Sequence, residues 1–121
     1  MNPTMQIVER EVGPVTILDL KGRLVVGDGD DLFRETLNHL IQGGRRHILL
    51  NLRDLTYIDS GGLGVMVSKY ISICNRGGQM KFCNVSDRPS KVLSITRLET
   101  IFQTFSSEAD ALKSFEAQSG R

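Results

Sequence analysis

The chain has 121 residues, of which 40% are hydrophobic and 24% charged, and its formal net charge is +1. This length is typical of one globular domain, so we expect a single domain over residues 1–121, with its core at about 4–117 and a frayed tail at 118–121. The near-neutral charge argues against nucleic acid as a partner, and no apolar run reaches the roughly 20 residues of a membrane-spanning helix.

The two cysteines, Cys74 and Cys83, are too few for a disulfide framework, and their spacing fits neither a redox pair nor a zinc site. We expect both to be buried thiols of the core. The N-terminus lacks the basic stretch and apolar block of a secretory signal peptide. Together these features predict a cytoplasmic protein without a metal or other cofactor.

Two β-branched, apolar segments at residues 5–12 and 15–21 flank Gly13-Pro14, which is a turn signal, and they predict a β-hairpin. A helix with one apolar face follows and ends at about Gln42. Three acidic residues precede or open this helix. They favour a helix start over a cation site, because no EF-hand spacing follows, and Asp28 is the candidate cap.

Strands and helices alternate after this point. The near-continuous apolar run at 46–52 is typical of a strand covered on both faces of a sheet. The pattern then predicts a helix to about Asn75, a strand at 79–85, a short helix at 88–97, a strand at 101–105 and a closing helix at 107–116. The order ββαβαβαβα predicts an α/β fold with a mixed, mostly parallel five-stranded sheet flanked by helices.

The most informative segment opens the helix that follows the buried strand. There Ser60 is placed to cap the helix, and Asp59 is placed to orient the loop. Gly61, Gly62 and Gly64 are unusual so early in a helix, where glycine is unfavourable. They would either leave a bare surface for a partner's backbone or allow close packing against the chain's own loops.

A helical wheel of this segment separates two faces. The face expected to join the core carries Leu63, Met66, Val67, Tyr70, Ile71 and Cys74. The face expected to point outward carries Val65, Ser68, Lys69, Ser72 and Arg76. An exposed edge that begins with small residues and then turns polar is more typical of a docking surface than of a catalytic cleft.

The segment 59–65, Asp-Ser-Gly-Gly-Leu-Gly-Val, resembles the signature of the STAS domains of anti-sigma factor antagonists. Residues 47–55 and 77–85 are similar to the strands and turns on either side of that signature, and the element order agrees over nearly the whole chain. The resemblance implies a non-enzymatic switch. In this family the unphosphorylated protein binds an anti-sigma factor, usually a serine kinase, and thereby releases a sigma factor.

The resemblance also implies a phosphorylation cycle. The kinase phosphorylates the signature serine, here Ser60, the complex separates, and a metal-dependent serine phosphatase restores the binding form. ATP and metal belong to those partners. The residues expected to contact the partner are Asp28, Asp30, Asp59, Gly61, Gly62, Gly64, Val65, Ser68 and Lys69.

One position departs from the family, since Val25 stands where many antagonists carry an acidic residue. This leaves a second hypothesis, a STAS subunit that docks constitutively in a transporter or sensory complex. An enzyme is disfavoured. The chain has no Gly-x-Ser-x-Gly motif and no phosphate-binding loop, and His39 and His47 are expected to be structural or surface residues.

Overall fold

A five-stranded sheet forms the centre of the computed structural model, which describes residues 5–119 and the side chains of residues 5–116. The strands lie in the sheet in chain order: β1 (Met5–Val12), β2 (Val15–Leu24), β3 (His47–Ile58), β4 (Gln79–Cys83) and β5 (Thr104–Phe105). β1 is antiparallel to β2, and β2 to β5 are parallel. The predicted hairpin and the mixed, mostly parallel sheet are therefore confirmed.

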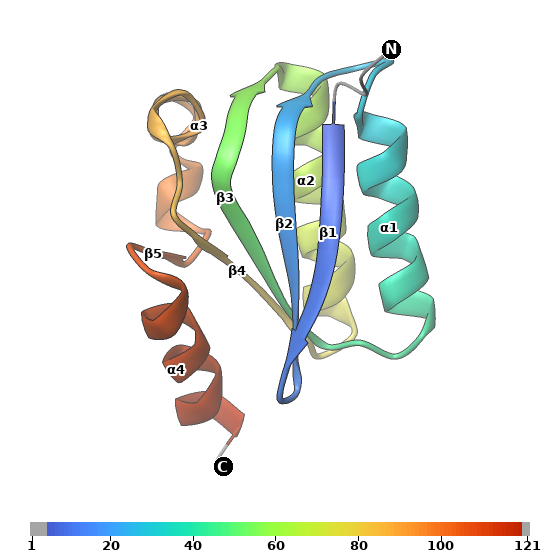
Figure 1. Cartoon of the computed structure of the whole chain (residues 1–121), viewed down its shortest axis with the longest axis vertical. Coiled ribbons are helices and arrows are strands. Elements are labelled where there is room, and N and C mark those ends of the chain that lie inside the picture. Colours follow the sequence, from blue (N-terminus) through green and yellow to red (C-terminus); the bar gives the residue numbers. More distant parts are fainter. Residues whose placement is uncertain (1–4, 120–121) are drawn as a thin grey trace.

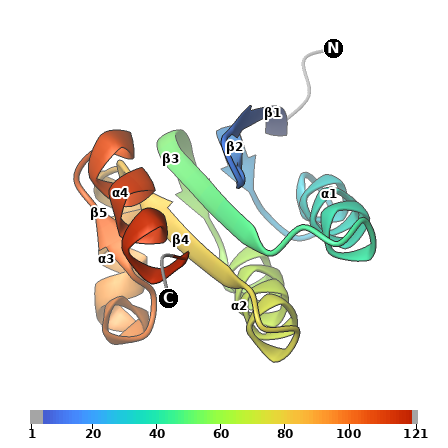
Figure 2. The same ribbon diagram turned by 90° about the horizontal axis from the view of Figure 1, so that it is seen from below.

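Helices cover the two faces of this sheet unequally. They are α1 (Asp30–Gln42), α2 (Ser60–Asn75), α3 (Asp87–Ile95) and α4 (Glu108–Ser119), with a short 3₁₀ helix, η1 (Leu98–Thr100), after α3. α1 and α2 lie on one face of the sheet, whereas α4 lies on the other face near β4 and β5 (Figures 1 and 2). The predicted element order is confirmed, with η1 as an addition.

The larger hydrophobic core lies between the sheet and the helices α1 and α2. The apolar spacing of α1 places Phe33 and Leu37 in this core, where both are fully buried. Alternate residues of β2 and β3 meet them from the sheet. A second, smaller cluster lies beneath α4 and consists of Val15, Ile17, Leu49, Cys83, Ala111 and Phe115.

Four strands differ from their predicted lengths. β2 runs to Leu24 rather than to residue 21, and β4 ends at Cys83 rather than at residue 85. β3 continues to Ile58, because two irregularities in its pairing with β2 let the polar residues after Leu52 stay in the sheet without entering the core. The strand expected at 101–105 is only Thr104–Phe105, because η1 and the turn after it occupy the preceding residues.

The last helix is longer than predicted. α4 runs to Ser119, so the expected frayed tail at 118–121 begins as helix. Residues 120–121 lie outside the described residues, as does residue 4, the expected start of the core. α4 begins at Glu108, one residue after the predicted start, and Ser107 caps it, since Ser107 Oγ accepts a hydrogen bond of 3.1 Å from the Asp110 N–H.

Candidate functional site

Ser60 lies at the end of the sheet where β3 passes directly into α2. The prediction that Ser60 caps α2 is wrong. Asp59 has extended backbone angles (φ −99°, ψ 178°), and its Oδ1 accepts a hydrogen bond of 2.7 Å from the Gly62 N–H. Ser60 is instead the first residue of the helix, and its side chain is exposed. The carboxylate is the stronger acceptor for the free N–H groups of a helix start, so the hydroxyl is left to solvent.

Asp59 also holds the connection between β2 and α1 against the start of α2. Its Oδ2 accepts a hydrogen bond of 3.1 Å from the Val26 N–H, and its own N–H donates to the Leu24 carbonyl at 3.2 Å. The bond from Gly62, and then that from Val26, lowers the pKa of the Asp59 carboxyl below its ordinary value. The sequence predicts that Asp59 orients the segment around Ser60; its carboxylate holds the start of α2 and, in addition, the separate connection between β2 and α1.

The three glycines after Ser60 have different surroundings. A Cβ on Gly61 would lie 1.7 Å from Val26 Cγ2, and one on Gly62 would lie 2.3 Å from the Leu24 carbonyl oxygen. These two glycines therefore pack closely against the chain's own segment at residues 24–26. Of the two explanations offered for the early glycines, close packing within the chain holds for Gly61 and Gly62. Gly64 has nothing within 4 Å of the corresponding position, so only this glycine leaves a bare surface.

The loop held by Asp59 presents an apolar side chain beside Ser60. Main-chain hydrogen bonds in both directions between Val25 and Asp28 close this loop as a tight turn. Val25, the position at which the resemblance in the sequence leads one to expect an acidic residue, is half-buried, whereas Val26 at the tip is 63% exposed. Because main-chain bonds fix the loop, the exposed Val26 side chain adds apolar surface beside Ser60.

The acidic residues of this loop do not cap α1 as predicted. The residue that precedes the helix is Gly29, with φ of 100°, and no side chain caps it, so the expectation for Asp28 is wrong. Asp30 opens the helix instead. Asp30 is 8% exposed, and its Oδ1 accepts hydrogen bonds of 3.0 Å from the N–H groups of Gly27 and Asp31. A contact of Asp28 or Asp30 with a partner stays a prediction.

The outward side of α2 is rotated from the predicted one. Val65 packs against the core, and Lys69 is half-buried, with its Nζ 2.6 Å from Asn38 Oδ1 of α1. Ile71, expected in the core, is 51% exposed, and Ile73 is buried in its place. Apolar residues occur all round this helix, so spacing alone did not identify the buried side. The exposed stripe along α2 consists of Ser60, Gly64, Ser68 and Ile71.

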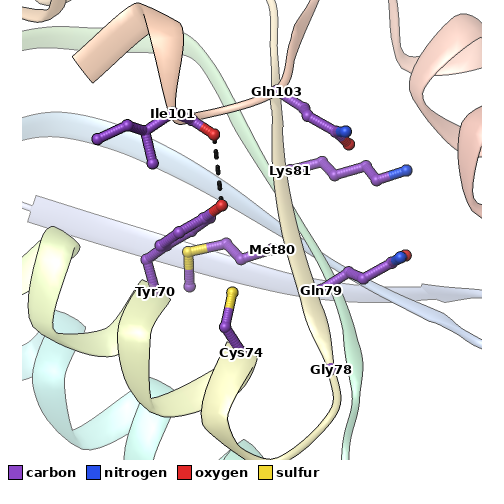
Figure 3. A pocket seen from close by; sticks show the side chains of 8 residues that line it. All are labelled: Tyr70, Cys74, Gly78, Gln79, Met80, Lys81, Ile101 and Gln103. Carbon is purple, nitrogen blue, oxygen red and sulfur yellow. Dashed lines mark hydrogen bonds between the residues drawn. The ribbon is translucent and has the colours of Figure 1, made fainter. Parts of the chain in front are cut away.

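A cavity of about 190 Å³ lies at the opposite end of the sheet from Ser60. Tyr70 lies beside it and donates a hydrogen bond of 3.3 Å from its hydroxyl to the Ile101 carbonyl (Figure 3). Cys74 also lines the cavity and is exposed, so the prediction that it is a core thiol is wrong, whereas Cys83 is buried as predicted. The other lining residues are Gly78, Gln79, Met80, Lys81 and Gln103.

The Ser60 end carries little catalytic chemistry. Within the described chain, no hydrogen bond engages the Ser60 hydroxyl, so no base is in place to activate it as a nucleophile. No cluster of metal-ligating side chains occurs between residues 5 and 116. No helix of the described part has the length and apolarity needed to cross a membrane. The arrangement offers an accessible hydroxyl at the start of an exposed stripe of α2.

Comparison with known proteins agrees with this geometry. The family model described as STAS domain matches residues 6–111 of the chain. The chain belongs to the STAS-domain family. Among curated relatives of this STAS domain, the anti-sigma F factor antagonist of Paenibacillus polymyxa is 33% identical over 90 residues, which make up 74% of this chain and 77% of the relative.

Two solved structures are similar to this STAS domain over most of their length. The crystal structure of the Thermotoga maritima protein TM1081 is 28% identical, with a TM-score of 0.83, over 89% of this STAS domain and 92% of that chain. The phosphorylated form of SpoIIAA from Bacillus is 20% identical, with a TM-score of 0.70, over 92% and 98% of the two chains. At that identity the likeness to SpoIIAA supports the fold alone.

Proposed function

We propose that this STAS domain is a cytoplasmic anti-sigma factor antagonist controlled by phosphorylation of Ser60. In its unphosphorylated form it binds an anti-sigma factor that is itself a serine kinase, and a sigma factor is released. The kinase then modifies Ser60, and a serine phosphatase reverses the modification. The single observation that supports this most is the exposed Ser60 hydroxyl, free of hydrogen bonds to the described residues, at the start of the exposed stripe on α2.

The domain itself should tolerate the phosphate. A phosphoserine carries about −1.5 to −2 charges at pH 7, and the positive end of the α2 dipole favours a negative group at this position. The Asp59 carboxylate is already occupied by the N–H groups of Gly62 and Val26. The Asp59 carboxylate would repel a phosphate on Ser60, so the phosphate would project away from the chain, toward a docked partner.

A partner that covers the α2 stripe would not tolerate the phosphate. If a partner carboxylate lay within about 4 Å, the repulsion would reach about 4 kcal/mol at an effective dielectric constant of 20. Since each 1.4 kcal/mol corresponds to about a tenfold change in affinity, one modification would abolish binding while the domain stays folded. Gly64 and Ser68 of the stripe and Val26 of the loop are the proposed close contacts.

The test uses the cognate kinase with ATP and three variants of the chain. Mass spectrometry should find phosphate on Ser60 of the wild type and none on Ser60→Ala, while Ser60→Ala still binds the kinase in calorimetry. Ser60→Asp should lose binding by about a hundredfold, because it mimics part of the phosphate charge. Ser106→Asp is the matched control, since Ser106 is exposed elsewhere and its substitution should leave binding unchanged.

Two outcomes contradict the proposal. Wild type left unmodified at Ser60 after incubation with kinase and ATP would exclude the phosphorylation switch. Equal binding of one partner by Ser60→Asp and Ser60→Ala would favour the alternative, a STAS subunit that docks constitutively in a transporter or sensory complex.

A further inference from the structure

The face of the sheet that carries α4 is covered only in part. α4 packs over Ile17 of β2 and Leu49 of β3, and beyond them the same face continues toward the ends of β2 and β3 without a helix in front of it (Figure 1). Because side chains alternate along a strand, Lys21 and Arg23 of β2 lie on the same face as Ile17. Tyr57 of β3 is the cross-strand partner of Arg23.

Cationic side chains gather on this uncovered part. Lys21, Arg23 and Arg53 of the sheet are exposed, and so is Arg88 at the start of the neighbouring helix α3. The guanidinium carbons of Arg23 and Arg88 lie 5.2 and 5.8 Å from the centroid of the Tyr57 ring. Tyr57 therefore brings two like charges from different elements close to one point on the surface.

These cations lack ion-pair partners within residues 5–116. The four residues form no salt bridge there, whereas Arg10, Arg34 and Arg45 do so with nearby carboxylates. The carboxylates nearest in sequence or register are Asp54, opposite Lys21, and Asp87, before Arg88, and both are exposed. Four cations against two carboxylates leave the face positive on a chain whose net charge is only +1.

We propose that this cationic face, defined by Lys21, Arg23, Arg53 and Arg88, binds an acidic segment of a protein partner. Charge complementarity is the argument for an acidic occupant. A protein is favoured over nucleic acid for two reasons. Two guanidinium groups already contact the Tyr57 ring, so the ring is not a free platform for base stacking, and the chain lacks the strong positive field that tracks a phosphate backbone.

This face is distinct from the Ser60 surface. The stripe on α2 lies on the other side of the sheet, so one partner could occupy the cationic face while another occupies α2 (Figure 2). Val8 of β1, which is 57% exposed and pairs in register with Asp19, adds an apolar contact at the border of the cationic face. The inference does not depend on phosphorylation of Ser60.

The test titrates a fluorescein-labelled oligoglutamate peptide into the isotope-labelled full chain at low salt. Amide shifts should be confined to residues 21–23, 53–57 and Arg88, and binding should weaken as salt is raised. The double variant Arg23→Gln/Arg88→Gln should bind about tenfold more weakly. The matched control is Arg76→Gln/Arg97→Gln, which removes two exposed arginines outside this face and should bind the peptide as the wild type does.

A second double variant, Lys21→Gln/Arg53→Gln, keeps the contacts of Arg23 and Arg88 with the Tyr57 ring. It should also bind the peptide more weakly than the wild type. The proposal can therefore be tested even if the first double variant folds poorly. Ser60→Asp should bind the peptide as tightly as the wild type. An equal loss of affinity in the control, shifts centred on α2, or no binding at low salt would each overturn the proposal. Tighter binding of a single-stranded DNA oligonucleotide at the same residues would also overturn it, in favour of nucleic acid.

Discussion

The two faces of the sheet are stabilised in different ways. On the face covered by α1 and α2, packing is almost wholly apolar, and Asp59 fixes the main chain at its upper end. On the α4 face, a small apolar cluster is joined by an ion-pair network in which Arg10 contacts both Asp19 and Glu108, and by the nearly buried Lys81. The larger apolar core therefore lies on the α1 and α2 face, whereas the α4 face combines a small apolar cluster with buried and paired charges.

The largest effect is expected at Gly62 on the α1 and α2 face. Gly62→Ala would place a methyl group 2.3 Å from the Leu24 carbonyl oxygen, so the loop or the helix start must move. We expect a loss of about 2–4 kcal/mol in the free energy of unfolding, measured by urea denaturation.

Gly64→Ala is the control for this substitution, because its added methyl group meets open space. Alanine is the better helix former, so this variant should gain up to about 1 kcal/mol. If the two substitutions had equal effects, the close approach of Leu24 to α2 would not contribute to stability.

Replacing Lys81 on the α4 face should increase the free energy of unfolding, by less than the loss expected for Gly62→Ala. Lys81 is 2% exposed, its Nζ lies 4.6 Å from the centroid of the Phe115 ring, and burial lowers the pKa of its ammonium group. Because the folded state disfavours the charged form, Lys81→Met should be more stable at neutral pH by on the order of 1 kcal/mol. A less stable variant would mean that the hydrogen bond to Ser114 and the aromatic contacts outweigh the burial of charge.

The stability difference between the wild type and Lys81→Met should depend on pH. Between its lowered folded pKa and the ordinary value of 10.5, Lys81 binds protons more strongly in the unfolded chain. The wild type should therefore gain stability relative to Lys81→Met as pH rises through this window. Cys83, whose pKa is raised to about 11 by burial, has the opposite effect but is present in both proteins, so it cancels in the difference.

The smallest effect is expected at Asp19 in the ion-pair network. Arg10 Nε lies 2.6 Å from Asp19 Oδ2, and this contact, followed by the hydrogen bond from Asn51, lowers the pKa of the Asp19 carboxyl. Its stabilisation is complete above the ordinary pKa of 3.8 and is lost as pH falls through the lowered folded value.

Asp19→Asn should therefore reduce stability by about 0.5–1 kcal/mol at neutral pH and by less in acid, as followed by thermal unfolding across pH. Asp31→Asn is the control, since it removes only an exposed pair with Arg34 on α1. A constant difference between Asp19→Asn and the wild type at every pH would show that charge is not the cause.

Much of the fold could be predicted from residue pattern. The turn at Gly13-Pro14 and the apolar run in β3 were sufficient for the hairpin and the buried strand, because both signals are local. The length of β5 was not predictable in this way. It depends on pairing with Phe82 and Cys83 of β4, and on the turn of η1 that removes the preceding residues from the sheet.

The candidate site, like the fold, could be predicted only in part. Residue pattern was enough to predict the α/β order, the start of α2 near Asp59-Ser60 and the family signature, because adjacent residues carry those signals. The three-dimensional packing was needed to show that Asp59 is the cap, that Gly61 and Gly62 are covered while Gly64 is open, and that Ile71 faces solvent. Each of these depends on which distant segment packs against α2, and the spacing of residues within one helix does not contain that information.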